Sequence, residues 1–255
     1  LEISSSMDIG EHPGCNRGTT WILTNADSVR MYKNDHFIKE YQREESPYKN
    51  LAHGPIVIDD FIGNALEEEE NMKPAQAAYV KKILNTTARY GLSNLPKSVY
   101  LMAAKLVLWY HMKPSDAVPL YNHYIGDWGG TSTVYRFEAV KGGKVVKTIV
   151  KEPVTSIRLD VIPNHIVLQE EHTYDVAAVR FRAVDQNGNV LPFCQEPLQL
   201  KAEGAIALIG EPVVGLSGGM GGTYVKTLGS EGEGTLTITS PQFGTQTVSF
   251  QIKKK

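Results

Sequence analysis

Residues Tyr135–Lys147 read YRFEAVKGGKVVK, and residues Val179–Asn189 read VRFRAVDQNGN. In both runs apolar side chains alternate with mostly charged ones, which is typical of a β-strand with one buried face. The first run passes through Gly142-Gly143 and the second ends at Asn187-Gly188, and such pairs tolerate the positive φ of two-residue hairpin turns. This part of the chain therefore predicts an antiparallel β-sandwich.

The composition is that of a globular protein with enough residues for one large domain or two ordinary ones. The chain has 255 residues, 42% of them hydrophobic and 21% charged, with a formal net charge of −2. This balance gives no basic surface for nucleic acid. No apolar run approaches the roughly 20 residues that span a bilayer. We therefore expect neither nucleic acid nor a membrane as a partner.

The first residues and the two cysteines bear on the context of the chain. Leu1–Ser6 reads as a mid-chain strand without a signal-peptide pattern, which predicts a piece of a larger polypeptide. Cys15 and Cys194 lie in segments that we assign to different domains. A disulfide between them is an open alternative, but two free thiols are the favoured interpretation. The compartment stays open, with the bacterial cytoplasm favoured.

Between residues 66 and 127 the sequence pattern changes from strands to helices. Four consecutive glutamates, residues 67–70, fit a solvated helix start or loop. Three helices are then predicted: one from Pro74 to a C-cap at Gly91, one from Pro96, and a short one from about Ser115. The first apolar stripe comprises Ala75, Tyr79, Ile83 and Tyr90, and the second comprises Val99, Met102, Ala103, Leu106 and Tyr110.

Strands precede and follow these helices. Short strand-like runs occupy residues 15–60, and strands resume after Gly129-Gly130. Residues 15–60 and 131–152 are each too short to bury a core alone, so we expect them to pair into one sandwich. The last hundred residues match the length of an immunoglobulin-like sandwich. The predicted fold is therefore mainly β: a lead-in segment 1–14, an immunoglobulin-like sandwich 15–155 interrupted by a three-helix insertion 66–127, and a C-terminal immunoglobulin-like sandwich 156–255.

Metal-ligating residue types are densest near the N-terminus, but their spacing matches no closed zinc pattern, and Pro13-Gly14 breaks any helix that would align them. Other histidines stand singly, without a neighbour that would make them a general base. We therefore expect no metal site and no cofactor. The first group is Asp8, Glu11, His12 and Cys15, and the single histidines include His111, His123, His165 and His172.

Three further motifs give no catalytic signature. Gly215–Gly222 (GLSGGMGG) leads into a strand and lacks the Gly-Lys-Ser/Thr and helix of a phosphate-binding loop, so we interpret it as a sandwich loop. Ser217 has no Gly-x-Ser-x-Gly elbow around it. Glycoside hydrolysis needs two carboxylates facing each other across ~5 to 10 Å, which neighbouring glutamates on one segment do not provide. Asn85-Thr86-Thr87 fits the glycosylation sequon but falls inside a predicted helix, so we treat it as a chance match.

Tryptophans are the remaining candidates for a binding role, because aromatic faces stack on sugar rings. Trp109 lies in a helical segment and is expected in the core. Trp128 lies in the loop GDWGG at residues 126–130, and it is the one candidate substrate-binding residue.

The run Trp21–Asp35, WILTNADSVRMYKND, resembles a strand-turn-strand that follows the catalytic barrel in family 2 glycoside hydrolases of the β-galactosidase type. Tyr135–Val146 resembles the later hairpin of that sandwich, and residues 156–189 resemble the family's C-terminal sandwich. The resemblance extends in pieces over residues 8–252 and includes no catalytic motif. The helical block 66–125 departs from the simplest family sandwich, which implies a subfamily with an inserted helical segment.

The resemblance implies a parent protein that is a retaining glycosidase, whose two catalytic glutamates lie on a (β/α)₈ barrel that this chain does not contain. The chain would then be a non-catalytic accessory region that braces the barrel of the same polypeptide, shapes its active-site entrance or provides homo-oligomer contacts. The alternative is a free-standing carbohydrate-binding or adhesion module. An accessory region predicts an exposed apolar patch, whereas a binding module predicts several exposed aromatics on one sheet face or loop cluster.

Overall fold

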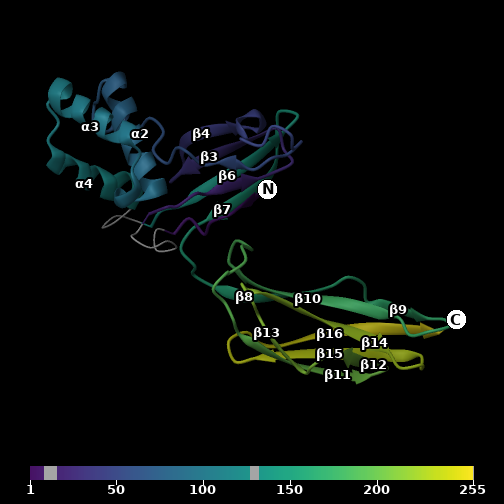
Figure 1. The fold of residues 1–255 in the computed structure, drawn as a ribbon. Helices are drawn as coiled ribbons and strands as arrows, with labels where there is room; N and C mark the ends of the chain where they lie inside the picture. The colour runs from purple at the N-terminus through teal and green to yellow at the C-terminus, as the bar shows by residue number, and fades with distance from the viewer. Residues whose placement is uncertain (9–15, 127–131, 255) are drawn as a thin grey trace. The chain divides into compact units, whose positions relative to one another are not determined.

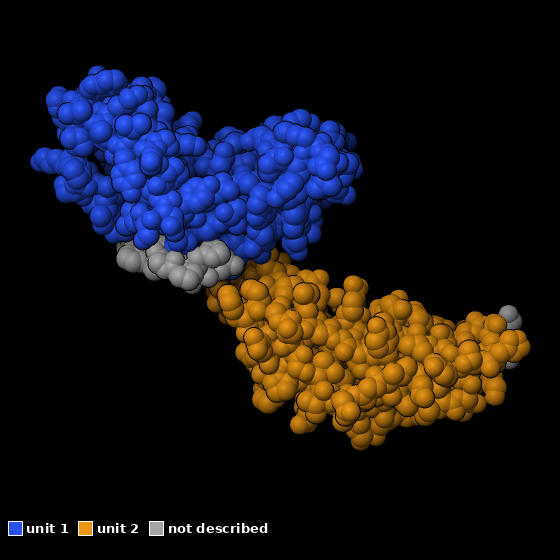
Figure 2. Space-filling model, viewed as in Figure 1, with its two compact units in different colours: residues 1–153 blue, residues 154–255 orange. Residues whose placement is uncertain are grey.

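The computed structural model describes residues 1–8, 16–126 and 132–254, which form two compact units, Leu1–Pro153 and Val154–Lys255 (Figures 1 and 2). Both units contain sheets whose strands are antiparallel except for the parallel pair of β9 (Val167–Glu170) and β16 (Gly244–Lys254), and among the described residues helices occur only in the first unit. The predicted fold class, two β-sandwiches with helices inserted in the first, is confirmed. The two units part beside Pro153, whose missing N–H cannot donate to a strand ladder.

The sandwich of the first unit joins strands from both sides of the helical insertion. Strand β3 pairs with β6, so that Met31 lies opposite Phe137, and both side chains are fully buried. Ile3 and Met7 are buried in the same core, so the segment expected as a lead-in contributes to this sandwich. One sheet has the order β4-β3-β6-β7, from β3 (Ser28–Lys33), β4 (His36–Gln42), β6 (Tyr135–Lys141) and β7 (Lys144–Lys151); the other has the order β1-β2-β5, from β1 (Glu2–Ile3), β2 (Trp21–Leu23) and β5 (Ile56–Val57).

The insertion folds into helices grouped beside this sandwich (Figure 1). Pro74 is the first residue of α2 and Pro96 precedes α3, as predicted, and Gly91 ends α2 with a φ of 71°. No helix in the described ranges is long and apolar enough to cross a membrane. The helices are α1 (Ala65–Glu68), α2 (Pro74–Tyr90), α3 (Lys97–Tyr110) and α4 (Ala117–Tyr121), and α4 continues into a π-helical turn, η5 (Asn122–Gly126).

The apolar stripe predicted for α2 is only partly buried: Tyr79 and Ile83 are half-buried and pack against the core. Ala75 and Tyr90 are exposed, whereas the fully buried residues of α2 lie on a neighbouring stripe. The helix has two apolar contacts, because one face enters the sandwich core while Tyr79 lies against Tyr110 of α3, with ring centroids 6.5 Å apart. The periodicity of the sequence identified only the side of α2 that contacts α3, and not the side that enters the core. The buried stripe comprises Ala77, Val80, Leu84 and Ala88.

The second unit is an uninterrupted sandwich. The alternation predicted from its sequence is observed, because Val179, Phe181 and Ala183 all point into the core with at most 1% exposure. One sheet has the order β12-β14-β10-β8 and the other β13-β11-β15-β16-β9. Their strands are β8 (Ile157–Pro163), β9 (Val167–Glu170), β10 (Val176–Asp185), β11 (Pro197–Gly204), β12 (Ile206–Ile209), β13 (Val213–Gly215), β14 (Met220–Thr227), β15 (Gly232–Ser240) and β16 (Gly244–Lys254).

The glycine-rich segment Gly215–Gly222 runs from the end of β13 in one sheet to the start of β14 in the other. The N–H of Gly219 donates to the carbonyl of Cys194 at 2.9 Å, and the carbonyl of Gly219 accepts from Ala183 at 2.8 Å. Gly219 has a φ of +76°, and a Cβ at this position would collide with the carbonyl of Leu191. The segment is therefore a tightly bonded turn that leads into a strand, with none of the helix N-terminus that binds phosphate.

Candidate functional site

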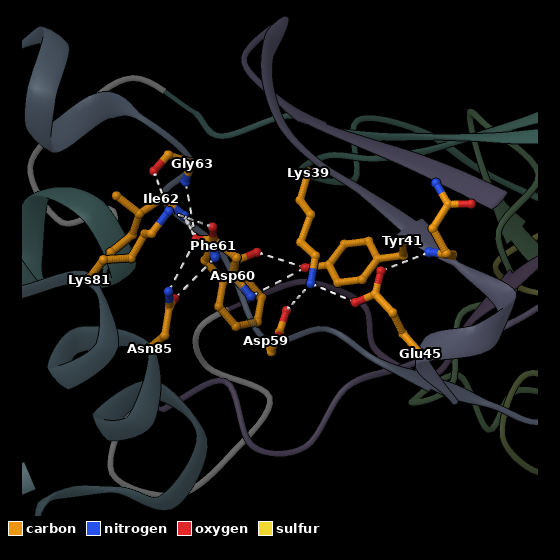
Figure 3. Close-up of polar contacts among 11 residues, drawn as sticks. Lys39, Tyr41, Glu45, Asp59, Asp60, Phe61, Ile62, Gly63, Lys81 and Asn85 are labelled. Atoms are coloured by element: carbon orange, nitrogen blue, oxygen red, sulfur yellow. Dashed lines mark hydrogen bonds and ion pairs between the residues drawn. The ribbon is translucent and has the colours of Figure 1, made fainter. Parts of the chain in front are cut away.

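The candidate site lies where the helical insertion joins the first sandwich, and a largely buried carboxylate, Asp60, is at the centre of this junction (Figure 3). Oδ1 of Asp60 accepts hydrogen bonds from the backbone N–H groups of Ile62 and Gly63 at 2.9 and 3.1 Å, and from Nδ2 of Asn85 at 3.1 Å. Oδ1 of Asn85 accepts from the N–H of Phe61 at 3.1 Å. Asn85 is therefore a buried bracket between α2 and the segment after β5, as expected if its sequon is a chance match.

Two lysines extend the network to either side of this carboxylate. Nζ of Lys81 lies 3.1 Å from Oδ2 of Asp60. On the sandwich side, Nζ of Lys39 donates to Oε2 of Glu45 at 2.7 Å and to Oδ1 of Asp59 at 2.9 Å. Burial would lower the pKa of Lys39, but the hydrogen bonds and charges of the two carboxylates outweigh it and raise the pKa. The junction is thus held by charge-assisted bonds on both sides.

A buried tyrosine completes the junction. The hydroxyl of Tyr41 donates to the carbonyl of Asp60 at 3.0 Å and lies 3.2 Å from the N–H of the same residue. Burial raises the pKa of Tyr41 well above its usual value, so the hydroxyl stays protonated. The polar groups of Tyr41, Asp60 and Asn85 bond to one another and to the backbone, so this network holds the helices against the sandwich.

A groove of about 660 Å³ opens on the helical side of the junction. At its edge the hydroxyl of Tyr124 lies 3.2 Å from Oε2 of Glu69 and 3.0 Å from Oε1 of Glu70. Burial and these two carboxylates raise the pKa of Tyr124. Nε2 of His123 lies 3.5 Å from the same oxygen of Glu69. The groove is lined by Glu70, Asn71, Met72, Gln76, Met112, Asp116, Pro119, Leu120 and His123.

Glu69 and Glu70 can accept hydrogen bonds, but they are not the opposed pair of carboxylates that glycoside hydrolysis uses. The two carboxylates share one tyrosine hydroxyl and lie side by side, whereas hydrolysis needs an opposed pair about 5–10 Å apart. The side chain of Glu69 is 52% exposed. Within the described ranges there is also no group of three residues that could hold a metal ion.

The predicted binding residue, Trp128, lies outside the described residues, so its role in binding substrate stays a prediction. Glu11, His12 and Cys15 of the candidate metal group also lie outside the described residues. Cys194 is a half-buried free thiol.

The chain just before residue 127 is firmly held. Nη2 of Arg17 donates to the carbonyl of Ile125 at 2.8 Å, and Nζ of Lys33 donates to that of Tyr124 at 2.8 Å. Arg17 is almost fully buried and lies 5.2 Å from the ring centre of Tyr135. No local pattern predicts the role of this cation, because Ile125 and Tyr135 are more than one hundred residues from Arg17 in the sequence.

Helix α3 has an uncovered apolar surface, which we call the outer face of α3 and define as Tyr100, Leu101, Ala104 and Leu108. All four are exposed. Trp109, at the edge of this face, is 66% exposed. Its expected place in the core is therefore wrong: Trp109 is helical, but its ring is exposed and lies 5.5 Å from Nζ of Lys105.

Comparison with known proteins gives a consistent family. No family model matches the chain. A β-galactosidase from Rhizobium radiobacter is 30% identical over 135 residues, which cover 50% of this chain and 92% of that protein. A β-galactosidase from Thermoanaerobacter pseudethanolicus is 39% identical over 212 residues, which cover 83% of this chain but 21% of that enzyme.

Solved structures show the same fold at low identity. A β-glycosidase from Bacteroides vulgatus matches with a TM-score of 0.55 and 12% identity, covering 98% of this chain and 24% of that one. A glycosyl hydrolase family 2 member from Bacteroides cellulosilyticus matches with a TM-score of 0.51 and 10% identity, covering 96% and 24%. The chain belongs to the family 2 glycoside hydrolases of the β-galactosidase type and corresponds to a region C-terminal to their catalytic barrel.

Proposed function

We propose that the chain is a non-catalytic accessory region of a β-galactosidase-type enzyme and that it stabilises the catalytic barrel of the same polypeptide. One observation carries this proposal: 83% of the chain aligns with a β-galactosidase at 39% identity, yet the match spans only 21% of that enzyme. The greater part of such an enzyme has no counterpart here. The side-by-side carboxylates of the groove support the same view, since they are not arranged for hydrolysis.

An apolar patch on the first sandwich supports contact with a neighbouring domain. The rings of Trp21 and Tyr48 lie 6.0 Å apart, and Leu23 and Leu51 beside them in sequence are 46% and 53% exposed. Exposed apolar groups gathered on one surface commonly mark an interaction site. We assign this Trp21–Tyr48 patch to the contact with the barrel.

The proposal is tested with the parent enzyme from which these residues have been deleted. The purified chain alone should not hydrolyse a nitrophenyl galactoside. Adding the chain to the truncated parent enzyme, hereafter the deleted enzyme, should raise the Tm and kcat/KM of that enzyme. For the Leu51→Glu variant, the concentration of chain needed to restore kcat/KM should be at least tenfold higher. Leu228→Glu is the matched control, because Leu228 is 54% exposed but lies in the second unit.

Turnover by the chain alone would contradict the accessory role. Binding of the chain to galactosides or other glycans, together with no effect on the deleted enzyme, would instead support the alternative of a free-standing carbohydrate-binding module. The exposed aromatics Tyr100 and Trp109 are the observation that favours this second candidate.

A further inference from the structure

The sheet β12-β14-β10-β8 of the second unit has an accessible side that the accessory role does not use. Along β14 buried and accessible residues alternate, so Tyr224 and Met220 point away from the core and are 54% and 53% exposed. Along β10 the same alternation turns Arg180 and Arg182 away from the core. We call these four residues, together with Lys226 of β14, the outer face of the β10 sheet.

The ring of Tyr224 is open toward β10 because its neighbours there are small. Its cross-strand partner on β10 is Ala178, and two residues before it stands Gly222, which pairs with Arg180. A Cβ at position 222 would lie 3.0 Å from the carbonyl oxygen of Val179, so the backbone itself keeps this place bare. A flat aromatic ring with bare surface beside it is a platform on which another ring can lie.

The outer face of the β10 sheet is positively charged. Arg180 is exposed and makes no hydrogen bond or ion pair with any residue that the structure describes. Arg182 donates through Nη2 to the carbonyl of Gly188 at 3.2 Å. Among the described residues of the four strands, the one carboxylate turned to this side is Asp160, opposite Arg182, and Arg158 already pairs with it at 3.1 Å. An unpaired guanidinium at a surface is suited to bind a carboxylate or another oxyanion.

The cation and the ring are spaced to hold one sugar unit. Arg180 is diagonal to Tyr224 across the two strands, and such residues lie about 7–8 Å apart. A pyranose ring can therefore lie with its C–H face on Tyr224 while an acidic group on the sugar reaches the guanidinium. Two residues further along β14, Nζ of Lys226 lies 5.3 Å from the ring centre of Tyr174, which is 53% exposed. A second ring and a second cation thus continue the row.

We propose that the outer face of the β10 sheet binds an anionic polysaccharide. Sugar rings lie on Tyr224 and Tyr174, and carboxylate or sulfate groups of the polymer bind Arg180 and Lys226. The charge of the face requires an acidic ligand, because the carboxylate of Asp160 is already paired. An acidic saccharide fits better than an acidic peptide, because the accessible aromatic ring suits the flat C–H face of a sugar and the chain belongs to a family of glycoside hydrolases.

The first test measures binding of the purified 255-residue chain to three polymers by isothermal titration calorimetry. Polygalacturonate carries carboxylates, dextran sulfate carries sulfate groups, and β-1,4-galactan carries neither. The chain should bind at least one of the acidic polymers ~tenfold or more tightly than galactan, because its arginine forms charge-assisted bonds only with the acidic groups. The acidic polymer with the lower Kd identifies the group that the face recognises.

The second test removes the ring and the cation separately. Tyr224→Ala should raise the Kd for the preferred polymer about two- to tenfold, and Arg180→Ala should raise it at least ~tenfold. Tyr224→Phe keeps the ring and should keep the Kd within about twofold of the unmodified chain. The matched controls are Tyr100→Ala and Arg43→Ala, which remove the same exposed residue types from the first unit and should leave the Kd unchanged. An unchanged Tm in each variant shows that a weaker Kd reflects the lost contact.

Four results would overturn the proposal. The acidic polymers could bind no better than galactan, or Tyr224→Ala and Arg180→Ala could bind as tightly as the unmodified chain. Poly-glutamate that binds as tightly as the acidic polysaccharides, with the same loss in Tyr224→Ala, would identify an acidic peptide as the partner. If Tyr100→Ala weakens binding and Tyr224→Ala does not, the saccharide binds at α3 and the assignment to the β10 sheet is wrong.

This inference goes beyond the accessory role and fails separately from it. Tyr224 and Arg180 lie in the second unit, whereas the Trp21–Tyr48 patch lies in the first, so both variants should restore kcat/KM of the deleted enzyme as well as the unmodified chain does. A chain that binds an acidic polysaccharide without restoring the deleted enzyme contradicts the accessory role alone. A chain that restores the enzyme but binds no acidic polysaccharide contradicts this inference alone.

Discussion

The two units solve the same problem, burying a sandwich core, in different ways. In the second unit the core consists of residues from two sheets and the loops between them, such as Phe181 and Phe250. In the first unit one continuous core includes sheet residues such as Phe137 together with helix residues such as Leu84 and Tyr124. The first sandwich is therefore completed by its helices, whereas the second needs none.

The joining of helices to a sandwich also accounts for the polar network at the junction in the first unit. A strand rises about 3.3 Å per residue and a helix 1.5 Å. Because the two do not match, backbone groups are left unpaired where a strand and a helix meet. Asp60 and Asn85 satisfy those groups. In the second unit the strand ladders satisfy most of the backbone. A comparable carboxylate is found there at a turn, where Oδ1 of Asp185 accepts from the N–H groups of Asn187 and Asn189 at 2.9 and 2.8 Å.

The largest expected effect tests whether the units unfold separately. Phe181→Ala should destabilise the second unit by about 3–5 kcal/mol, because it leaves a cavity in the core. All three tryptophans lie before residue 153, so tryptophan fluorescence reports the first unit alone. Urea unfolding should show an earlier circular dichroism transition and an unchanged fluorescence midpoint. The mirror variant, Phe137→Ala, should lower the fluorescence midpoint. A lowered fluorescence midpoint in Phe181→Ala would show that the two units unfold together.

The junction itself should give the next largest effect. Asn85→Ala leaves the N–H of Phe61 without its acceptor, which should lower the free energy of unfolding of the first unit by about 1–3 kcal/mol. Hydrogen exchange should also rise in α2. Asn94→Ala is the matched control, since Asn94 is exposed at the surface. If the two variants are equally stable, the helices do not depend on this bracket.

The smallest expected effect is the pH dependence at Lys39. The pKa of Lys39 is raised in the folded state, so its contribution is complete below its unfolded pKa of about 10.4 and is lost as the pH rises through the folded value. The stability difference between the unmodified chain and Lys39→Met, about 1 kcal/mol or less at pH 8, should therefore shrink by pH 11. Lys201→Met, which breaks an exposed pair with Glu203, serves as the control. A difference that stays constant to pH 11 would contradict the assigned role of the two carboxylates.

Much of the fold follows from the sequence because its signals are local. The alternation around Phe137 and Phe181 predicts the strands, and the positions of Pro74 and Pro96 predict the helix starts. The joining of strands across the insertion also follows, since neither half can bury a core alone. The buried stripe of α2 does not follow, because that helix has two apolar contacts and periodicity cannot rank them.

The candidate site was much less predictable than the fold. The glutamates 67–70 read correctly as solvated, but the contact of Glu69 and Glu70 with Tyr124 joins residues 54 or 55 positions apart. The Asp60–Asn85 pair spans 25 positions and shows no periodic signal. Trp109 was placed in the core because an apolar helix residue is usually buried, and only the packing of α3 shows which side is covered.

The pairing of β3 with β6 has a consequence for biosynthesis. About one hundred residues separate the two strands, so at ~5–20 residues per second the β3–β4 hairpin waits roughly 5 to 20 s for its neighbour to leave the ribosome. During that interval one edge of β3 has unpaired backbone groups, a template for misassociation between nascent chains. Closure of α2 onto the core before β6 emerges would shorten the gap that the late strand must bridge.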